Sequence, residues 1–305
     1  MLKRTIIVAC GFALLAVSVG HSGSAKITAT DDRPKTITLA ATPKRIVSLA
    51  PTATEYLYAA GLRERIVGVT EFCKFPPDAV SKKKVGNLTN PSLETILALK
   101  PDLVVAAKLN PLEVLDRIEA LHIPVFGTDP NTLEDVLKIV ERLARLGGTE
   151  NQAQEFLKPL RVRLEGVKKK MVGLNPDHRP TVFYLLECEP IFTAGKGSIV
   201  DEIIALAGGV NAAHDLPKPW GNFSMETLVA RNPDVLVISG NDADAALKRA
   251  VEKESRFQLL SAVKKNRVIA FPTDWIGSPT PRAVEGMEKL AKYLHPQLFA
   301  AKPKK

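Results

Sequence analysis

The sequence predicts an α/β protein of two related lobes joined by a helical connector. First, the segment Pro91–Val105 recurs as Phe223–Val237, with seven of 15 paired positions identical at a constant spacing of 132 residues. Second, short apolar strand-like segments alternate with helical ones in both halves, a pattern typical of parallel sheets with helices on both faces. Third, a chain of 305 residues has the length of two ordinary domains.

The first 25 residues have the pattern of an export signal. Lys3 and Arg4 precede the apolar run Thr5–Val19, and small residues follow up to Ala25, where we expect cleavage. The run is too short for a typical membrane-spanning helix. Cleavage before Cys10 would leave few apolar residues ahead of the cut, which disfavours a lipid anchor but leaves it as an alternative. We therefore expect a periplasmic protein.

The first lobe is predicted over residues 44–148, after an N-terminal extension at residues 26–43. It should begin with a buried strand at Lys44–Leu49, followed by a helix that Thr52 or Thr54 caps and Gly61 ends. The remaining elements are expected as strands at Arg65–Val69, Leu103–Ala107 and Ile123–Gly127, and helices at Pro111–Leu121 and Asn131–Gly148.

Residues 149–175 are predicted to form the connecting helix. Glu150–Leu157 is rich in helix formers, and Leu160 and Leu164 share one face farther on. Pro159 predicts a kink or a later start of the helix. Because the connector lacks the Gly and Ser of a flexible linker, we expect a single rigid helix and lobes held at a nearly fixed angle.

The second lobe is predicted over residues 176–300, and a basic tail follows at residues 301–305. Its beginning repeats that of the first lobe weakly, since Glu55–Gly61 and Glu202–Gly208 share Glu, Ala and Gly. The expected elements are strands at Thr181–Leu186, Val235–Ser239 and Arg267–Phe271, and helices at Gly197–Ala207 and Pro281–Leu294.

The candidate ligand site lies in the loops after the strands, because ligands of open parallel sheets bind beyond the carboxyl ends of the strands. Trp220 and Trp275 are the two tryptophans of the chain, and both lie in Pro- and Gly-rich loops. Phe72 lies in a loop of the first half. These side chains are either core anchors or the flat walls of a pocket for a large planar or macrocyclic ligand, with Asp274 as a polar contact.

Patterns for catalysis, metal binding and nucleic-acid binding are missing from the sequence. It has no phosphate-binding or dinucleotide-binding glycine motif and no nucleophile elbow. Its histidines lack metal-ligand spacing. The formal charge of +9 comes partly from lysine runs that are separated and lack interleaved aromatics. We therefore expect no enzyme activity, no cofactor, no bound metal ion and no nucleic-acid partner.

The chain after the export signal resembles the substrate-binding proteins of iron-complex and cobalamin ABC importers, and within them the cobalamin-binding members. The likeness covers residues 43–297. It rests on Arg45–Glu55, the paired Leu-Glu-Thr and Met-Glu-Thr segments, Lys100–Val104, Phe192–Ser198 and Thr273–Trp275. The resemblance implies two Rossmann-like lobes joined by one long helix, with a shallow cleft between them. It also implies a monomer, peripheral to the inner membrane, that delivers cobalamin or a related corrinoid to a permease dimer with its ATPase subunits.

Two glutamates of the repeat, Glu94 and Glu226, have two interpretations. Each lies in the first turn of a helix after Ser92 or Ser224, where the helix dipole stabilises an acid by about 0.3–1 kcal/mol. The resemblance implies a further role, in which each glutamate docks onto arginines of one permease subunit.

The resemblance also implies a ligand pocket and, less directly, a disulfide. The expected ligand-binding residues are Pro51, Thr52, Phe72, Cys73, Leu88, Trp220, Asp274, Trp275 and Ser278. Leu88 stands where a tryptophan is expected and Ser278 where an arginine is expected, which leaves haem or a ferric siderophore as alternative ligands. A chelatase-like enzyme with His214 in its cleft is a remote alternative. Cys73 and Cys188 would lie in facing loops, so we expect an inter-lobe disulfide, with two free thiols as the alternative.

Overall fold

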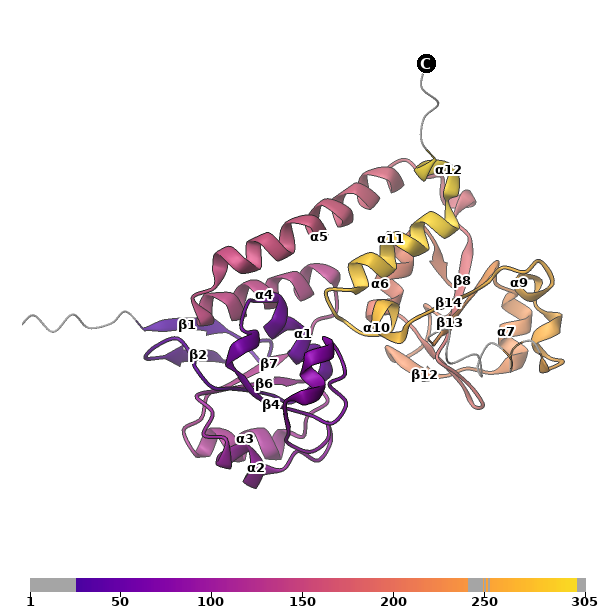
Figure 1. Cartoon of the computed structure of the whole chain (residues 1–305). Helices are drawn as coiled ribbons and strands as arrows, with labels where there is room; N and C mark the ends of the chain where they lie inside the picture. The colour runs from indigo at the N-terminus through magenta and orange to yellow at the C-terminus, as the bar shows by residue number, and fades with distance from the viewer. Residues whose placement is uncertain (1–25, 241–248, 250, 252, 301–305) are drawn as a thin grey trace, which may run out of the picture.

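The computed structural model describes residues 26–240, 249, 251 and 253–300, which form two α/β lobes joined by a long helix (Figure 1). We use the name N-lobe for residues 44–148 and C-lobe for residues 176–300. The fold class predicted from the sequence is confirmed. The predicted export signal, Cys10 and the basic tail at residues 301–305 lie outside the described residues.

The N-lobe is built on a parallel sheet of five strands in the order β5-β4-β3-β6-β7. The central strands are buried on both faces, which explains why they appear in the sequence as continuous apolar runs. The strands are β3 (Ile46–Ser48), β4 (Ile66–Val69), β5 (Lys83–Lys84), β6 (Leu103–Ala107) and β7 (Val125–Thr128).

Four helices cover this sheet: α1 (Pro51–Ala59), α2 (Leu93–Ala98), α3 (Leu112–Ala120) and α4 (Leu133–Gly147). The predicted start of α4 is confirmed, because Thr132 and Asp135 form a capping box there. The predicted threonine cap of α1 is wrong. Pro51 occupies the first turn, and the hydroxyl of Thr54 donates to the carbonyl of Ala50 instead. Two 3-10 turns complete the lobe, η1 (Arg63–Arg65) and η2 (Pro77–Ser81).

The C-lobe repeats the plan with a parallel sheet in the order β11-β8-β13-β14. Its strands are β8 (Thr181–Leu185), β11 (Val210–Asn211), β13 (Val235–Ser239) and β14 (Val268–Phe271). Its α-helices are α6 (Ile199–Leu206), α7 (Met225–Arg231), α9 (Ser261–Lys264), α10 (Thr273–Ile276), α11 (Ala283–Leu294) and α12 (Pro296–Phe299), with 3-10 turns η3 (Pro176–His178) and η5 (Phe257–Leu259).

Two small antiparallel sheets were not predicted. One is a hairpin of β1 (Ile27–Thr30) and β2 (Thr36–Leu39), which packs on α4 within the stretch expected only as an extension. The other, in the C-lobe, has the order β12-β10-β9 and consists of β9 (Glu187–Cys188), β10 (Ile191–Ala194) and β12 (Trp220–Asn222). Strands this short carry too little periodicity to be distinguished from loops.

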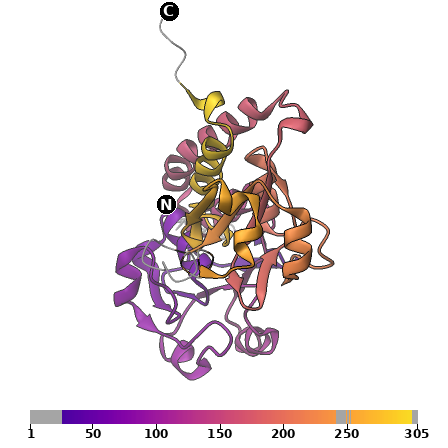
Figure 2. The same ribbon diagram turned by 90° about the vertical axis from the view of Figure 1, so that its right-hand side faces the viewer.

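The connector is the single helix α5 (Glu150–Met171), which runs through Pro159 without a break. Pro159 is exposed, so the carbonyl that loses its helical donor there lies on the solvent side. The 22 residues of α5 span about 33 Å. α5 packs against α4 and α11, and Figures 1 and 2 both show α5 and α11 side by side.

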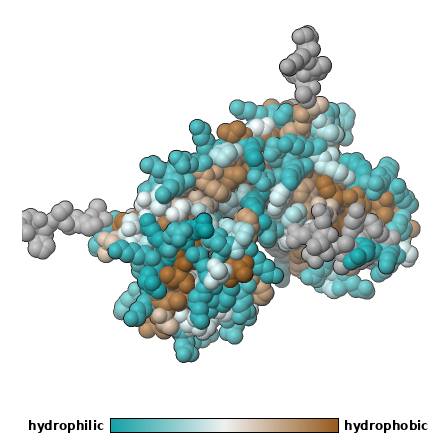
Figure 3. Space-filling view, viewed as in Figure 1, coloured by the Kyte–Doolittle hydropathy of each residue, from teal (hydrophilic) through white to brown (hydrophobic). Residues whose placement is uncertain are grey.

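One hydrophobic core links the parts of the molecule. The largest buried cluster runs from the N-lobe, through Leu157 and Leu164 of α5, into the C-lobe at Val182 and Leu290. The face shown in Figure 3 is mostly hydrophilic, with apolar patches on each lobe. Within the described ranges, none of the helices combines the length and apolar character needed to cross a bilayer.

Candidate functional site

The candidate site is the junction where the loops beyond the two parallel sheets meet. α1 follows the carboxyl end of β3, and the segment Pro272–Arg282 follows the carboxyl end of β14. These segments touch, because the hydroxyl of Tyr56 donates to the carbonyl of Pro279. The carboxyl ends of both sheets therefore point toward one inter-lobe junction, as the topological rule for ligand sites requires.

On the N-lobe side, the predicted ligand-binding residues lie in the first turn of α1 and in two loops. Pro51 and Thr52 form the half-buried first turn of α1, and the side chain of Phe72 is 56% exposed. Leu88 is partly buried and packs on the core. Phe72 is thus the large apolar side chain that this set offers to solvent.

Asn110, which the sequence analysis did not select, ties the segment before α1 and the Leu88 loop to its own loop after β6. Its amide nitrogen donates to the carbonyls of Leu49, at 2.9 Å, and Leu88, at 2.8 Å. Its side-chain oxygen accepts from the backbone N–H of Ala107 at 2.8 Å. A buried amide with all these partners fixes the relative positions of three loops. A single Asn in a loop carries no sequence signal for this role.

On the C-lobe side, Trp220 belongs to an aromatic group. Its ring stacks on Phe192 with 6.4 Å between centroids and 9° between planes. It also meets the edge of Tyr184, near the end of β8, at 6.2 Å. Trp220 and Phe192 are half-buried, on paired strands of the small antiparallel sheet. The second ring, Phe192, comes from a strand that was not predicted.

The second group of predicted residues follows β14. Asp274 is exposed and forms an ion pair with Arg282, Nη2 to Oδ2 at 3.0 Å. Trp275 turns to another side, where the amine of Lys289 lies 3.6 Å from the centre of its ring. Ser278 is half-buried next to Pro279. Trp275 therefore lies on the wall of an inter-lobe groove, whereas Asp274 is linked to Glu55 of the N-lobe through Arg282.

Arg282 is the main residue that the sequence analysis missed. Its guanidinium makes two hydrogen bonds to Glu55 of the N-lobe, at 2.9 Å from Nε and 2.6 Å from Nη2. Its Cζ also lies 3.9 Å from the ring centre of Phe75. Burial raises the pKa of Glu55, and the hydrogen bonds and charge of Arg282 oppose that effect. Because Glu55 and Arg282 lie in different lobes, no local sequence motif could have revealed the ion pair.

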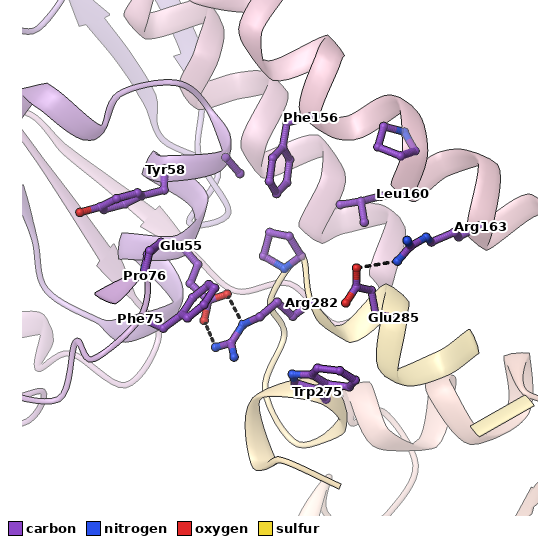
Figure 4. A pocket seen from close by; sticks show the side chains of 13 residues that line it. Glu55, Tyr58, Phe75, Pro76, Phe156, Leu160, Arg163, Trp275, Arg282 and Glu285 are labelled. Atoms are coloured by element: carbon purple, nitrogen blue, oxygen red, sulfur yellow. Dashed lines mark hydrogen bonds and ion pairs between the residues drawn. The ribbon is translucent and has the colours of Figure 1, made fainter. Parts of the chain in front are cut away.

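A groove of about 700 Å³ lies beside this ion pair, between the lobes and α5 (Figure 4). Its walls include Tyr58, Phe75, Phe156 and Trp275, and they are largely apolar. Figure 4 shows the aromatic side chains around the Glu55–Arg282 pair. The charged groups on its walls are paired with one another, for instance Arg163 with Glu285.

Both cysteines of the described chain are free, which contradicts the expected disulfide. Cys73 is fully buried in the N-lobe core, and its sulfur lies 3.1 Å from the hydroxyl of Thr70 and 3.2 Å from that of Thr54. Cys188 is half-buried on β9, beside Arg256 and Phe257. A thiol enclosed in one lobe cannot reach a loop of the other, and full burial also removes Cys73 from the ligand-binding set.

Glu94 and Glu226 occupy the same local structure in both lobes. Each is exposed in the first turn of its helix, α2 or α7. The caps match: Ser92 accepts from the amide of Thr95 at 3.2 Å, and Ser224 accepts from that of Thr227 at 3.0 Å. Hydrogen bonds from its own backbone and from Ser224 lower the pKa of Glu226. The structure thus presents two similar acidic corners, one on each lobe.

His214 is paired with Asp201, with Nδ1 to Oδ1 at 2.9 Å, and it is exposed. Among the described residues, no group of three or more His, Cys, Asp or Glu side chains could hold a metal ion.

Comparisons with known proteins agree with this architecture. A family model described as "Periplasmic binding protein" matches residues 46–274. The vitamin B12-binding protein of Vibrio cholerae is 33% identical over 253 residues, which cover 82% of this chain and 89% of that protein. A Bacillus subtilis protein, the uncharacterized ABC transporter substrate-binding lipoprotein YvrC, is 32% identical over 278 residues, covering 90% of this chain and 87% of that protein.

Solved structures resemble the chain as well. The crystal structure of the periplasmic vitamin B12 binding protein BtuF of Vibrio cholerae matches with a TM-score of 0.74 at 31% identity, covering 83% of this chain and 97% of that one. The periplasmic heme-binding protein RhuT from Roseiflexus sp. RS-1, in its apo form, matches with a TM-score of 0.72 at 26% identity, covering 84% and 99%.

Proposed function

Because the chain belongs to the periplasmic binding protein family, we propose that it captures cobalamin or a related corrinoid between its lobes and delivers it to an ABC importer. A solute-binding role follows from the family itself. The corrinoid is the more specific part of the proposal, and it draws on the vitamin B12-binding relatives and on the junction described above.

The observation that carries the proposal is the set of solvent-accessible aromatic side chains that both lobes carry in the predicted ligand-binding segments. Trp220 and Phe192 form a stacked pair on the C-lobe side, and Phe72 is exposed on the N-lobe side. A corrin ring is broad, flat and largely apolar at its faces, so it matches flat aromatic walls better than a set of charged groups. Asp274 supplies an exposed acceptor for the amide groups at the rim of such a ring.

Haem is the second candidate ligand, because haem-binding proteins share the fold. A haem iron needs an axial ligand, commonly a histidine or tyrosine. Of the tyrosines described above, Tyr56 and Tyr184 are buried, and the half-buried Tyr58 donates its hydroxyl to Asp78 at 2.7 Å. This chemistry supports the corrinoid over haem.

The remaining features support export and docking. Residues 1–25 act as an export signal in this proposal, and the mature protein works in the periplasm as a monomer. Glu94 and Glu226 dock onto the two subunits of the permease, since they present matched acidic corners on the two lobes. The protein holds no cofactor of its own and carries out no catalysis.

Calorimetric titration of residues 26–305 tests the ligand. We expect saturable binding of cyanocobalamin at micromolar concentration or below, and none of haem at the same concentrations. Trp220→Ala should weaken cyanocobalamin binding by about 1–3 kcal/mol, because it removes one of the two stacked rings.

Phe156→Ala is the matched control, since Phe156 is an exposed aromatic residue on the wall of the groove beside α5. It should leave the affinity unchanged. A loss in Phe156→Ala with none in Trp220→Ala would move the ligand to the groove. Haem binding without cyanocobalamin binding would replace the corrinoid by haem.

A further inference from the structure

Glu55 of α1 crosses from the N-lobe to the C-lobe. Its side chain is 5% exposed, and both carboxylate oxygens accept from Arg282, which directly precedes α11. A two-pronged bond between a guanidinium and a carboxylate fixes orientation as well as distance. The contact therefore resists both separation and rotation of the lobes at this point.

Glu202 of α6 crosses in the opposite direction. Its Oε2 accepts at 2.7 Å from the backbone N–H of Leu133, the first residue of α4 in the N-lobe. This N–H belongs to the first turn of α4, whose amides have no hydrogen-bond acceptor within the helix. The carboxylate of Glu202 supplies that acceptor. The carboxylate also lies at the positive end of a helix of 15 residues.

The two contacts occupy equivalent places in the repeated fold. α1 and α6 are the first α-helices after the internal strands β3 and β8, and Glu55–Gly61 and Glu202–Gly208 share Glu, Ala and Gly. α4 and α11 are the long helices after the edge strands β7 and β14. Each glutamate thus binds the start of the other lobe's long helix.

We propose that Glu55 and Glu202 are a pair of inter-lobe clasps, related by the internal repeat, that together hold the lobes at one angle. Two contacts on different helices resist rotation of the lobes more strongly than either contact alone. The shared core through α5 limits separation of the lobes, and the clasps limit their rotation. The inference concerns the protein without ligand, so it stands or falls independently of the ligand proposed above.

Double electron–electron resonance measures the angle directly. Spin labels are placed at Glu113→Cys on α3 and Lys264→Cys on α9, both exposed, in a Cys188→Ser background; Cys73 is buried and stays unlabelled. We expect one narrow distance distribution for this parent without ligand. Glu55→Ala and Glu202→Ala should each broaden and shift it, and the double variant should broaden it most.

Two matched variants separate a clasp from a general loss of structure. Asp135→Asn disturbs the capping box of α4 within the N-lobe and should leave the distribution narrow. Glu202→Gln keeps an acceptor for Leu133 and should also behave as the parent does. Where Glu55→Ala fails to fold by circular dichroism, Glu55→Gln takes its place, because it keeps the side-chain volume and loses the charge.

Three results would overturn the inference. An unchanged distribution in the double variant would leave the lobe angle to the core and α5. If Asp135→Asn and Glu202→Ala broadened the distribution equally, Glu202 would stabilise only the start of α4 and would not fix the angle between the lobes. If only one of the two alanine variants broadened the distance distribution, the two contacts would not act as an equivalent pair.

Discussion

At the scale of single residues, the junction is organised by Arg282. It holds Glu55 of the N-lobe by two hydrogen bonds and Asp274 of the C-lobe by a third, and its side chain is 20% exposed. Removing one partner of such a desolvated ion pair costs more than an exposed pair contributes, since the remaining charge stays buried. The orientation of Asp274, the polar ligand contact in our proposal, thus depends on Arg282, which itself need not touch the ligand.

Arg282→Lys tests this dependence, because a lysine keeps the charge but cannot hold two carboxylates with one planar group. We expect the dissociation constant for cyanocobalamin to rise roughly tenfold, the effect of about 1.4 kcal/mol. In an Asp274→Asn background the same change should have little further effect. The double-mutant cycle, measured by calorimetry, decides: additive losses would mean that Arg282 does not act through Asp274.

Glu202 gives the fold a dependence on pH. Burial raises the pKa of Glu202 from its ordinary value of 4.5 to about 7, the hydrogen bond from Leu133 opposes that shift, and Asp135 adds to it. Lys168 lowers it and Glu134 raises it. Between these two pH values the folded protein keeps a proton that the unfolded chain releases. The free energy of unfolding therefore falls as the pH rises from about 4.5 to about 7.

Denaturant unfolding at several pH values checks this. Glu202→Gln should remove a decline of about 1–2 kcal/mol across the window, a value reduced to allow for the partial exposure of Glu202. Glu113→Gln, an exposed change on α3, serves as the control and should follow the parent. An identical decline in Glu202→Gln would assign the pH dependence to other groups.

At the scale of elements, the two ends of α4 are each stabilised by specific residues. α4 begins with a capping box at Thr132 and ends at Gly148, whose φ of 64° suits glycine. Its first amide is satisfied by Glu202 from the other lobe. The start of α4 is therefore stabilised both by its own capping box and by a hydrogen bond to the other lobe.

Thr132→Ala should lower the free energy of unfolding by about 1 kcal/mol, because the amide of Asp135 loses its acceptor. Thr132→Ser keeps the acceptor and should recover most of that loss. Both values come from denaturant unfolding at a fixed pH. A loss as large in Thr132→Ser would point to the methyl group instead of the cap.

At the scale of the whole molecule, the internal repeat produces two lobes with one acidic corner each. Glu94 and Glu226 are exposed, share the same serine cap and lie on the equivalent helices α2 and α7. A partner with two similar subunits can meet such a pair with two similar basic patches. Matched corners and a fixed lobe angle together would set the spacing that the partner has to recognise.

The double variant Glu94→Ala/Glu226→Ala should keep its affinity for cyanocobalamin and lose most of its ability to stimulate the ATPase of the permease in vesicles. The single variants should each lose part of it. Glu113→Ala, another exposed helix acid, is the control. Full stimulation by the double variant would exclude these glutamates from docking.

The sequence by itself determined the features that depend on neighbours along the chain. Periodicity and apolar runs predicted the longer parallel strands and most helices but not the two-residue edge strands β5 and β11. Thr132 and Gly148 marked the ends of α4, because these signals act over a few residues. The repeat revealed the matched glutamates for the same reason. Only the tertiary structure showed that Cys73 is buried in the core, that Phe192 stacks on Trp220 and that Arg282 forms an ion pair with Glu55. Glu55 and Arg282 are 227 residues apart, and contacts between distant residues arise from packing, which leaves no local pattern.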